Sequence, residues 1–381
     1  MQDEIDFLDE MIPDDQQEDE GDLNEKDISF KDAVVMNADW TIETINGQVK
    51  KGNIDLDPGF QRRSAWDNIR QSRLIESLIV SLPIPNIVLA ENKSSRGRFL
   101  VIDGKQRLLT INSFMADQLV LKGLDLRKDL NGKTYSTLDE EDREFLENST
   151  LRSTVIKNWH DENFLFIMFF RLNSGSLPLS PQELRKALIG GKVLNEIESY
   201  IENSKSFHKV FGTIPDKRMR DSELVLRFIA FDISYETYNG NLKDFLDKAT
   251  KLFEDDWDNQ KEALTEAFTR LNLALDTNFE LFGRDAFKKW LGGGYERRIN
   301  RAIFDCVTRF FSSEDISQAA LANPDLVVEA FKETCIDLRF KEAVEKTTKS
   351  VGATHTRIEV WGEVLANRLG KVFNPVTARI E

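Results

Sequence analysis

Hydrophobic and polar positions change their spacing near residue 190, and this change predicts two differently built regions. Before it, short apolar runs alternate with helical patterns. The expected strands are Asn86–Ala90 and Arg98–Ile102, with shorter candidates at Thr41–Val49, Ile54–Leu56 and Thr154–Trp159; the expected helices are Asn68–Val80, Asp161–Leu172 and one that starts in the capping box of Ser180-Pro181-Gln182-Glu183. This mixture favours a small sheet covered by helices.

After residue 190 the signals for strands fade, and apolar residues recur at helical spacing. The expected helices are Asn195–Asn203, Ser222–Ile233, Leu242–Phe253, Gln260–Asn278, Asp285–Leu291, Tyr295–Phe311, Asp325–Glu333 and Thr354–Arg368. We therefore predict an α+β chain, in which a mixed domain over residues 29–190 precedes a mostly helical domain over residues 191–381.

Negative charge is concentrated at the N-terminal end. Residues 1–27 contain 13 acidic side chains and one lysine, which accounts for most of the net charge of −15. Dense like charge without long apolar periodicity is typical of disordered segments, so we predict an acidic disordered tail over residues 1–28. This tail either solvates the chain, docks to a partner through Ile5–Ile12, or mimics nucleic-acid charge over a basic cleft. The remaining chain is nearly neutral, so the low pI does not exclude a DNA partner.

Cysteine and histidine content narrows the class of protein. The two cysteines, Cys306 and Cys335, lie far apart in the sequence, which is typical of a reducing compartment. Three scattered histidines do not supply a zinc site of ordinary spacing. No apolar stretch has the length of a membrane span, and the acidic start does not resemble a signal peptide. We expect a cytoplasmic protein without a membrane partner.

The most informative local pattern is a strand that runs through a sharp turn into a helix, over residues 98–115. The turn is Asp103-Gly104, and the helix then begins with Lys105-Gln106-Arg107. The N-terminus of a helix exposes backbone N–H groups and a partial positive charge, and therefore binds phosphate. The two basic side chains add full charges there. In the simpler alternative, Asp103 caps the helix and the basic side chains are solvated.

Three segments with distinctive motifs follow one another in the first half of the chain. They are Gln61-Arg62-Arg63 with Trp66 after it, Asp103-Gly104-Lys105-Gln106-Arg107, and Arg171-Leu172-Asn173-Ser174-Gly175. Together they resemble the GmrSD-type restriction endonuclease N-terminal domain family, whose fold is similar to ParB and sulfiredoxin. The family's middle motif is Asp-Gly-Gln-Gln-Arg, so Lys105 departs from it and the role of this side chain is open.

The resemblance implies a ParB/sulfiredoxin-like domain that binds and hydrolyses an NTP, with Mg²⁺ as the expected cofactor. By position it nominates Asp103, Gln106 and Arg107 as catalytic. Arg107 would stabilise charge on the phosphoryl oxygens and Gln106 would orient a water. Asp103 would hold Mg²⁺ or act as a base, with the helix cap as its alternative role. The candidates for nucleotide binding are Gln61, Arg62, Arg63, Gly104, Lys105, Asn173 and Ser174, of which the last two also fit an ordinary helix-ending turn.

A second basic group follows the glycine run Gly292-Gly293-Gly294. Arg297, Arg298 and Arg301 lie at helical spacing, so we expect them to share one helix face and contact DNA phosphates. A solvated helix surface is the alternative. The glycine run lacks the Lys-Ser/Thr ending of a Walker A loop and does not predict one.

Three functions remain open at this stage. The first is an NTP-hydrolysing component of a DNA restriction or anti-phage defence system. Any cleavage of DNA would come from the ParB-like domain itself or from a nuclease partner protein, because three scattered histidines do not supply the paired-histidine metal site of the nuclease domain that family members often carry. The second is a non-catalytic, nucleotide-gated DNA-binding module. The third is an adaptor that recruits other proteins through its acidic tail. The sequence does not reveal the nucleotide, any recognition of modified bases, or the oligomeric state.

Overall fold

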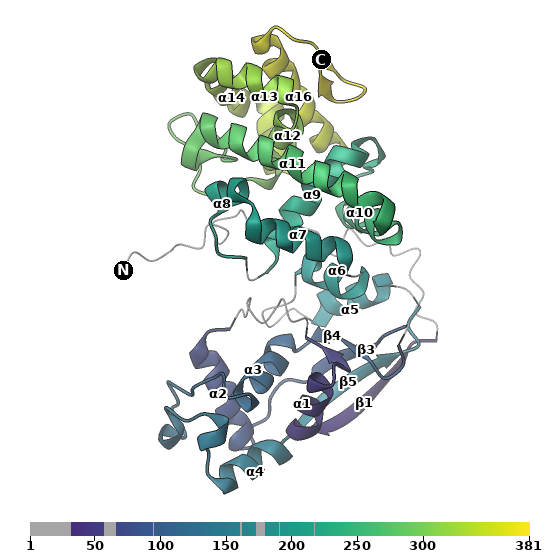
Figure 1. Cartoon of the computed structure of the whole chain (residues 1–381), viewed down its shortest axis with the longest axis vertical. Helices are drawn as coiled ribbons and strands as arrows, with labels where there is room; N and C mark the ends of the chain where they lie inside the picture. Colours follow the sequence, from purple (N-terminus) through teal and green to yellow (C-terminus); the bar gives the residue numbers. More distant parts are fainter. Residues whose placement is uncertain are drawn as a thin grey trace. The chain divides into compact units, whose positions relative to one another are not determined.

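The computed structural model describes residues 32–56, 66–93, 95–160, 162–172, 180–189, 191–216 and 218–381. These residues divide into two compact units, with the boundary between Leu188 and Ile189. We call them the N-terminal unit and the C-terminal unit and describe each by itself (Figure 1). The predicted tail over residues 1–28 lies outside the described residues.

A five-stranded mixed sheet, in the order β1-β5-β3-β4-β2, is the centre of the N-terminal unit. Helices α1 to α4 pack against one another beside this sheet (Figure 1). The strands are β1 (Val34–Thr41), β2 (Ile54–Asp55), β3 (Ile87–Glu91), β4 (Phe99–Asp103) and β5 (Thr150–Lys157); the helices are α1 (Ile42–Lys50), α2 (Asn68–Ile79), α3 (Lys105–Met115), α4 (Glu140–Asn148), α5 (Glu162–Leu172) and α6 (Pro181–Ile189).

Strand register brings three chain segments together at one end of the sheet. β3 is antiparallel to β4, with Val88 opposite Asp103, and parallel to β5, with Ile87 opposite Ser153. The start of β3, the end of β4 and the first half of β5 therefore lie side by side. The turn singled out in the sequence lies at this end, where β4 leads into α3.

The predicted strand Thr41–Val49 is wrong, because these residues form the helix α1. The Thr41 hydroxyl accepts a hydrogen bond from the Thr44 amide (3.2 Å) and so caps the helix, and Ile42 and Ile45 are fully buried at helical spacing. The strand precedes the helix instead: β1 pairs with β5 along its whole length.

The other predicted strands and helices of this unit are present. The helix predicted over Asn68–Val80 is α2, capped by the Asp67 carboxylate, which accepts from the Arg70 amide at 2.7 Å. The predicted capping box before α6 is confirmed: the Ser180 hydroxyl accepts from the Glu183 amide (3.1 Å), and the Glu183 carboxylate accepts from the Ser180 amide. Strand β1 and helix α4 had no clear signal in the sequence.

The C-terminal unit is helical apart from one short hairpin. Its helix α12 is buried along its entire length, so the other helices are arranged around it. The helices are α7 (Lys192–Asn203), α8 (Lys205–Phe211), α9 (Arg220–Ser234), α10 (Leu242–Asp255), α11 (Trp257–Phe282), α12 (Arg301–Phe311), α13 (Glu314–Ala322), α14 (Pro324–Ile336), α15 (Leu338–Glu345) and α16 (Val351–Leu369), and the hairpin is β6 (Phe373–Asn374) with β7 (Arg379–Ile380). The predicted α+β class with a mostly helical C-terminal region is confirmed.

Two predicted helices of this unit differ from the structure. Residues 285–291, expected to be helical, follow a single 3-10 turn at Gly283–Asp285 and are otherwise irregular. The helix expected from Tyr295 begins only at Arg301, because Asn300 caps it by accepting from the Ile303 amide at 3.1 Å. Tyr295 instead pairs with Trp290 in an isolated β-bridge.

A buried ionic cluster lies at the centre of the C-terminal unit. The Asp305 carboxylate on α12 accepts from Arg227 of α9 (2.5 Å) and from Arg357 of α16 (3.1 Å). All three side chains are at most 4% exposed. Burial alone would lower the pKa of Arg227, but the charge and hydrogen bonds of Asp305 raise it above its ordinary value. The cluster therefore joins three helices through charges that compensate one another.

None of the helices in the described part of the chain has both the length and the apolar character that crossing a bilayer requires.

Replacing Asp305 by alanine should destabilise the C-terminal unit by about 3–5 kcal/mol, since the buried guanidinium of Arg357 loses its carboxylate partner and that of Arg227 keeps only Glu223, at 3.7 Å. The free energy of unfolding in urea measures this loss. Asp315→Ala, which removes an exposed carboxylate paired with Lys371, is the control and should cost under about 1 kcal/mol. Equal effects of the two substitutions would contradict the assignment.

Candidate functional site

The turn between β4 and α3 depends on a glycine. Gly104 is the N-cap residue of α3 and has a φ of +95°, a conformation that side-chain-bearing residues rarely adopt. A Cβ added at this position would lie 2.4 Å from Ile87 Cγ2 and 2.9 Å from Ile87 Cβ. The glycine thus allows the N-terminus of α3 to lie directly against the start of β3.

The N-terminus of α3 has the properties of an anion site. No side chain of the described residues caps it, and its first turn contains no acidic residue. The first hydrogen bond of the helix runs from the Leu108 amide to the Gly104 carbonyl (3.1 Å), so the amides of residues 105–107 precede it. Such amides, together with the partial positive charge of the helix end, attract phosphate oxygens.

Arg107 is buried and engaged within this turn. Only 4% of the residue is exposed, and its Nη2 donates to Asp103 Oδ2 (2.6 Å) and to the Asn86 carbonyl oxygen (2.9 Å). Its Nε is buried and has no acceptor among the described residues. We call the group formed by Asp103, Arg107 and Asn86 the turn clamp. It ties the end of β4 and the first turn of α3 to the start of β3.

Asp103 does not have the alternative role of capping α3. The carboxylate does not cap α3, because Gly104 occupies the N-cap position and Asp103 binds the Arg107 guanidinium one helical turn further on. The structure also changes the expected position of Arg107. Its guanidinium faces protein groups rather than open solvent, so contact with a phosphoryl oxygen would require the clamp to rearrange.

The remaining sequence candidates divide into two sets. Lys105 and Gln106 are both half-buried on the first turn of α3. The other nucleotide-binding candidates lie outside the described residues: Gln61, Arg62, Arg63, Asn173 and Ser174.

A magnesium site can be assessed only from Asp103. The described residues contain no group of three or more histidine, cysteine, aspartate or glutamate side chains that could hold a metal ion. Mg²⁺ in nucleotide sites is commonly held by one or two carboxylates together with phosphate oxygens. Asp103 fits that arrangement only as a single carboxylate, one oxygen of which already binds Arg107.

The late basic group does not form the predicted helix face. Arg297 and Arg298 are exposed but precede α12, whereas Arg301, its first residue, is 1% exposed and lies 3.9 Å from Glu223. Burial lowers the pKa of Arg301, and the charge of Glu223 opposes this shift. Arg301 is therefore a core residue that DNA cannot reach, and its assignment to a DNA surface is wrong.

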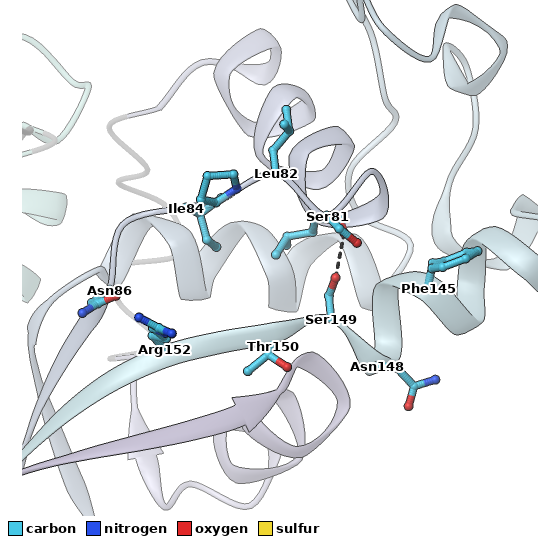
Figure 2. A pocket seen from close by; sticks show the side chains of 11 residues that line it. Ser81, Leu82, Ile84, Asn86, Phe145, Asn148, Ser149, Thr150 and Arg152 are labelled. Carbon is cyan, nitrogen blue, oxygen red and sulfur yellow. Dashed lines mark hydrogen bonds between the residues drawn. The ribbon is translucent and has the colours of Figure 1, made fainter.

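A cavity of about 660 Å³ opens at the same end of the sheet. Its walls come from three places: the end of α2 with the loop after it, the end of α4, and the first residues of β5. Figure 2 shows Leu82, Ile84 and Phe145 around the cavity, with Asn86 and Arg152 at one side of it. Asn86 belongs both to this cavity and to the turn clamp.

Sequence analysis missed the cavity residues. Residues 78–86 and 145–152 are distant in the sequence and are brought together by the β3–β5 pairing, the packing of α2 against α4, and the hydrogen bond from the Ser149 hydroxyl to the Leu78 carbonyl (2.7 Å). No local motif marks such a meeting of two segments.

The fold and the turn define an α+β domain in which a strand, a glycine turn and a helix with an uncapped N-terminus form the central element. Residues 42–190 match the family of the GmrSD restriction endonuclease, N-terminal domain. This part of the chain is therefore a GmrSD-type N-terminal domain, as its three motifs predict. No curated protein and no solved structure matches the chain.

Replacing Arg107 by alanine should destabilise the N-terminal unit by about 3 kcal/mol, because the Asp103 carboxylate and the Asn86 carbonyl lose a buried donor. Urea unfolding measures the change. Arg73→Ala is the matched control: Arg73 pairs with Asp125 at the same kind of distance (2.7 Å), but both side chains are more than half exposed. This control should cost under about 1 kcal/mol. A stable Arg107→Ala protein would show that the turn clamp does not support the fold.

Proposed function

We propose that this chain is the NTP-binding and NTP-hydrolysing component of a DNA restriction or anti-phage defence system. The observation that carries the proposal is the uncapped N-terminus of α3, which follows a glycine turn and has no acidic residue in its first turn. Membership of residues 42–190 in a restriction endonuclease family supports the setting, and it makes DNA the expected macromolecular partner.

Binding of the triphosphate would use the main chain first. The amides of residues 105–107 donate to phosphate oxygens, and the Lys105 ammonium adds a full positive charge at the same place. Gln106 orients the attacking water, and Asp103 holds Mg²⁺ jointly with the phosphates. Arg107 acts first as a positioning residue, since its clamp fixes the turn that presents these amides.

A second candidate is a nucleotide-gated DNA-binding module without turnover. The turn clamp favours it, because the Asp103 carboxylate and the Arg107 guanidinium neutralise each other in the structure. In such a module, the nucleotide would hold one conformation of the turn and hydrolysis would be incidental. This candidate predicts that NTP binds tightly and that DNA does not stimulate the release of phosphate. The first candidate predicts that DNA stimulates this release.

Lys105→Ala should raise the KM for NTP about tenfold or more, because a charge-assisted contact to phosphate is lost. Gln106→Ala should lower kcat about tenfold to a hundredfold with a smaller effect on KM, as expected for a group that acts on the attacking water. Phosphate release in the presence of Mg²⁺, with and without DNA, measures both constants.

Lys122→Ala is the control for these two variants. It removes one exposed positive charge beyond the C-terminal end of α3 and should leave both constants unchanged. Wild-type kinetics in Lys105→Ala and Gln106→Ala would rule out the α3 N-terminus as the site of hydrolysis.

A further inference from the structure

The cavity beside the turn clamp carries one positive charge and no negative charge. Within the described part of the chain, Arg152 is its only charged lining residue, and no aspartate or glutamate lines it. Asp39 lies opposite Arg152 in the β1–β5 register, yet no carboxylate of the described residues forms an ion pair with this guanidinium. An exposed arginine at the side of a concave site is therefore available to an anionic group of a ligand.

Apolar side chains form another wall of the cavity. Leu82 is 46% exposed and Phe145 is 52% exposed, and Ile84 lies near Leu82 (Figure 2). An aromatic ring exposed at the edge of a cavity offers a face for a planar ring, and base–aromatic stacking tolerates every base. The cavity volume is within the range of small-molecule sites, about 300–1,000 Å³.

Two side-chain amides lie at opposite sides of the cavity, Asn148 on the side of Phe145 and Asn86 on the side of Arg152 (Figure 2). Asn148 donates its Nδ2 to the Glu144 carbonyl (2.9 Å), so its Oδ1 remains as an acceptor for a base edge. The Asn86 side chain makes no hydrogen bond among the described residues, and its amide can donate to a phosphate oxygen.

Two main-chain carbonyls at the cavity are already bonded. The Leu78 carbonyl accepts from the Ser149 hydroxyl (2.7 Å) and the Ser81 amide (3.2 Å), and the Phe145 carbonyl accepts from the Ser149 amide (2.9 Å). These two carbonyls, near the ends of α2 and α4, are therefore not bare acceptors that would repel an anion.

We infer that this cavity binds a single nucleotide, with its base against Phe145 on the side of Asn148, and its phosphate at Arg152 on the side of Asn86. The nucleotide is either free in solution or one unit of a DNA strand, since both present the same base and phosphate chemistry. The site is distinct in residues from the α3 N-terminus, and it stands whether or not an NTP is hydrolysed there. The two sites meet at Asn86, whose carbonyl accepts from Arg107.

Titration calorimetry on the full chain tests the inference with mononucleotides of each common base and with a short single-stranded DNA. Arg152→Ala should weaken binding about tenfold or more, and Phe145→Ala about tenfold, because they remove the phosphate contact and the stacking face. Phe145→Tyr should retain the affinity. If these two variants lose affinity for mononucleotides, the ligand is a free nucleotide. If they lose affinity only for the DNA strand, the ligand is one unit of DNA.

Arg98→Ala is the matched charge control, because Arg98 is exposed and lies at the opposite end of β4. It should bind both probes like the wild type. Lys105→Ala should also retain the mononucleotide binding that depends on Arg152 while its KM for NTP rises, which separates the two sites. If neither probe binds, or if Arg152→Ala and Phe145→Ala bind like the wild type, the inference is overturned even where NTP hydrolysis is found.

Discussion

The buried ion pair between Asp103 and Arg107, extended to the Asn86 carbonyl, is the interaction on which the arrangement of the N-terminal unit depends. It spans one helical turn and joins three elements: the last residue of β4, the first turn of α3 and the residue before β3. Gly104 makes this contact possible, because any side chain there would collide with Ile87. The position of the α3 N-terminus and the neighbouring cavity both follow from the way the clamp holds these segments together.

Local patterns predicted the elements that carry the turn. The run Phe99–Ile102, the Asp103-Gly104 turn and the helical spacing after it are properties of adjacent residues, and the structure has the strand, turn and helix in these places. The pairing of Asp103 with Arg107 also had a signal in the sequence, since residues four apart on a helix contact each other. The interpretation of Arg107 as a phosphate ligand did not include its pairing with Asp103.

Features that depend on tertiary packing could not be predicted in the same way. Arg301 occurs in a basic sequence, yet Asn300 starts α12 at that residue and Arg301 becomes part of the core near Glu223. Helical spacing alone therefore predicted DNA phosphate as the partner of Arg301, whereas the structure places this side chain near Glu223. The cavity lined by Phe145 and Arg152 is formed by strand pairing between distant segments, which no pattern within either segment reveals. Arg301 is buried and Arg152 is exposed, although their sequence contexts do not show this difference.

Amide hydrogen exchange of the full chain, with and without a non-hydrolysable NTP analogue and Mg²⁺, tests the central claim most directly. If the main chain at the start of α3 binds the triphosphate, exchange at residues 105–107 slows when the analogue is added, and the helix beyond Leu108 changes little. Bound analogue with unchanged exchange at these three amides would contradict the account.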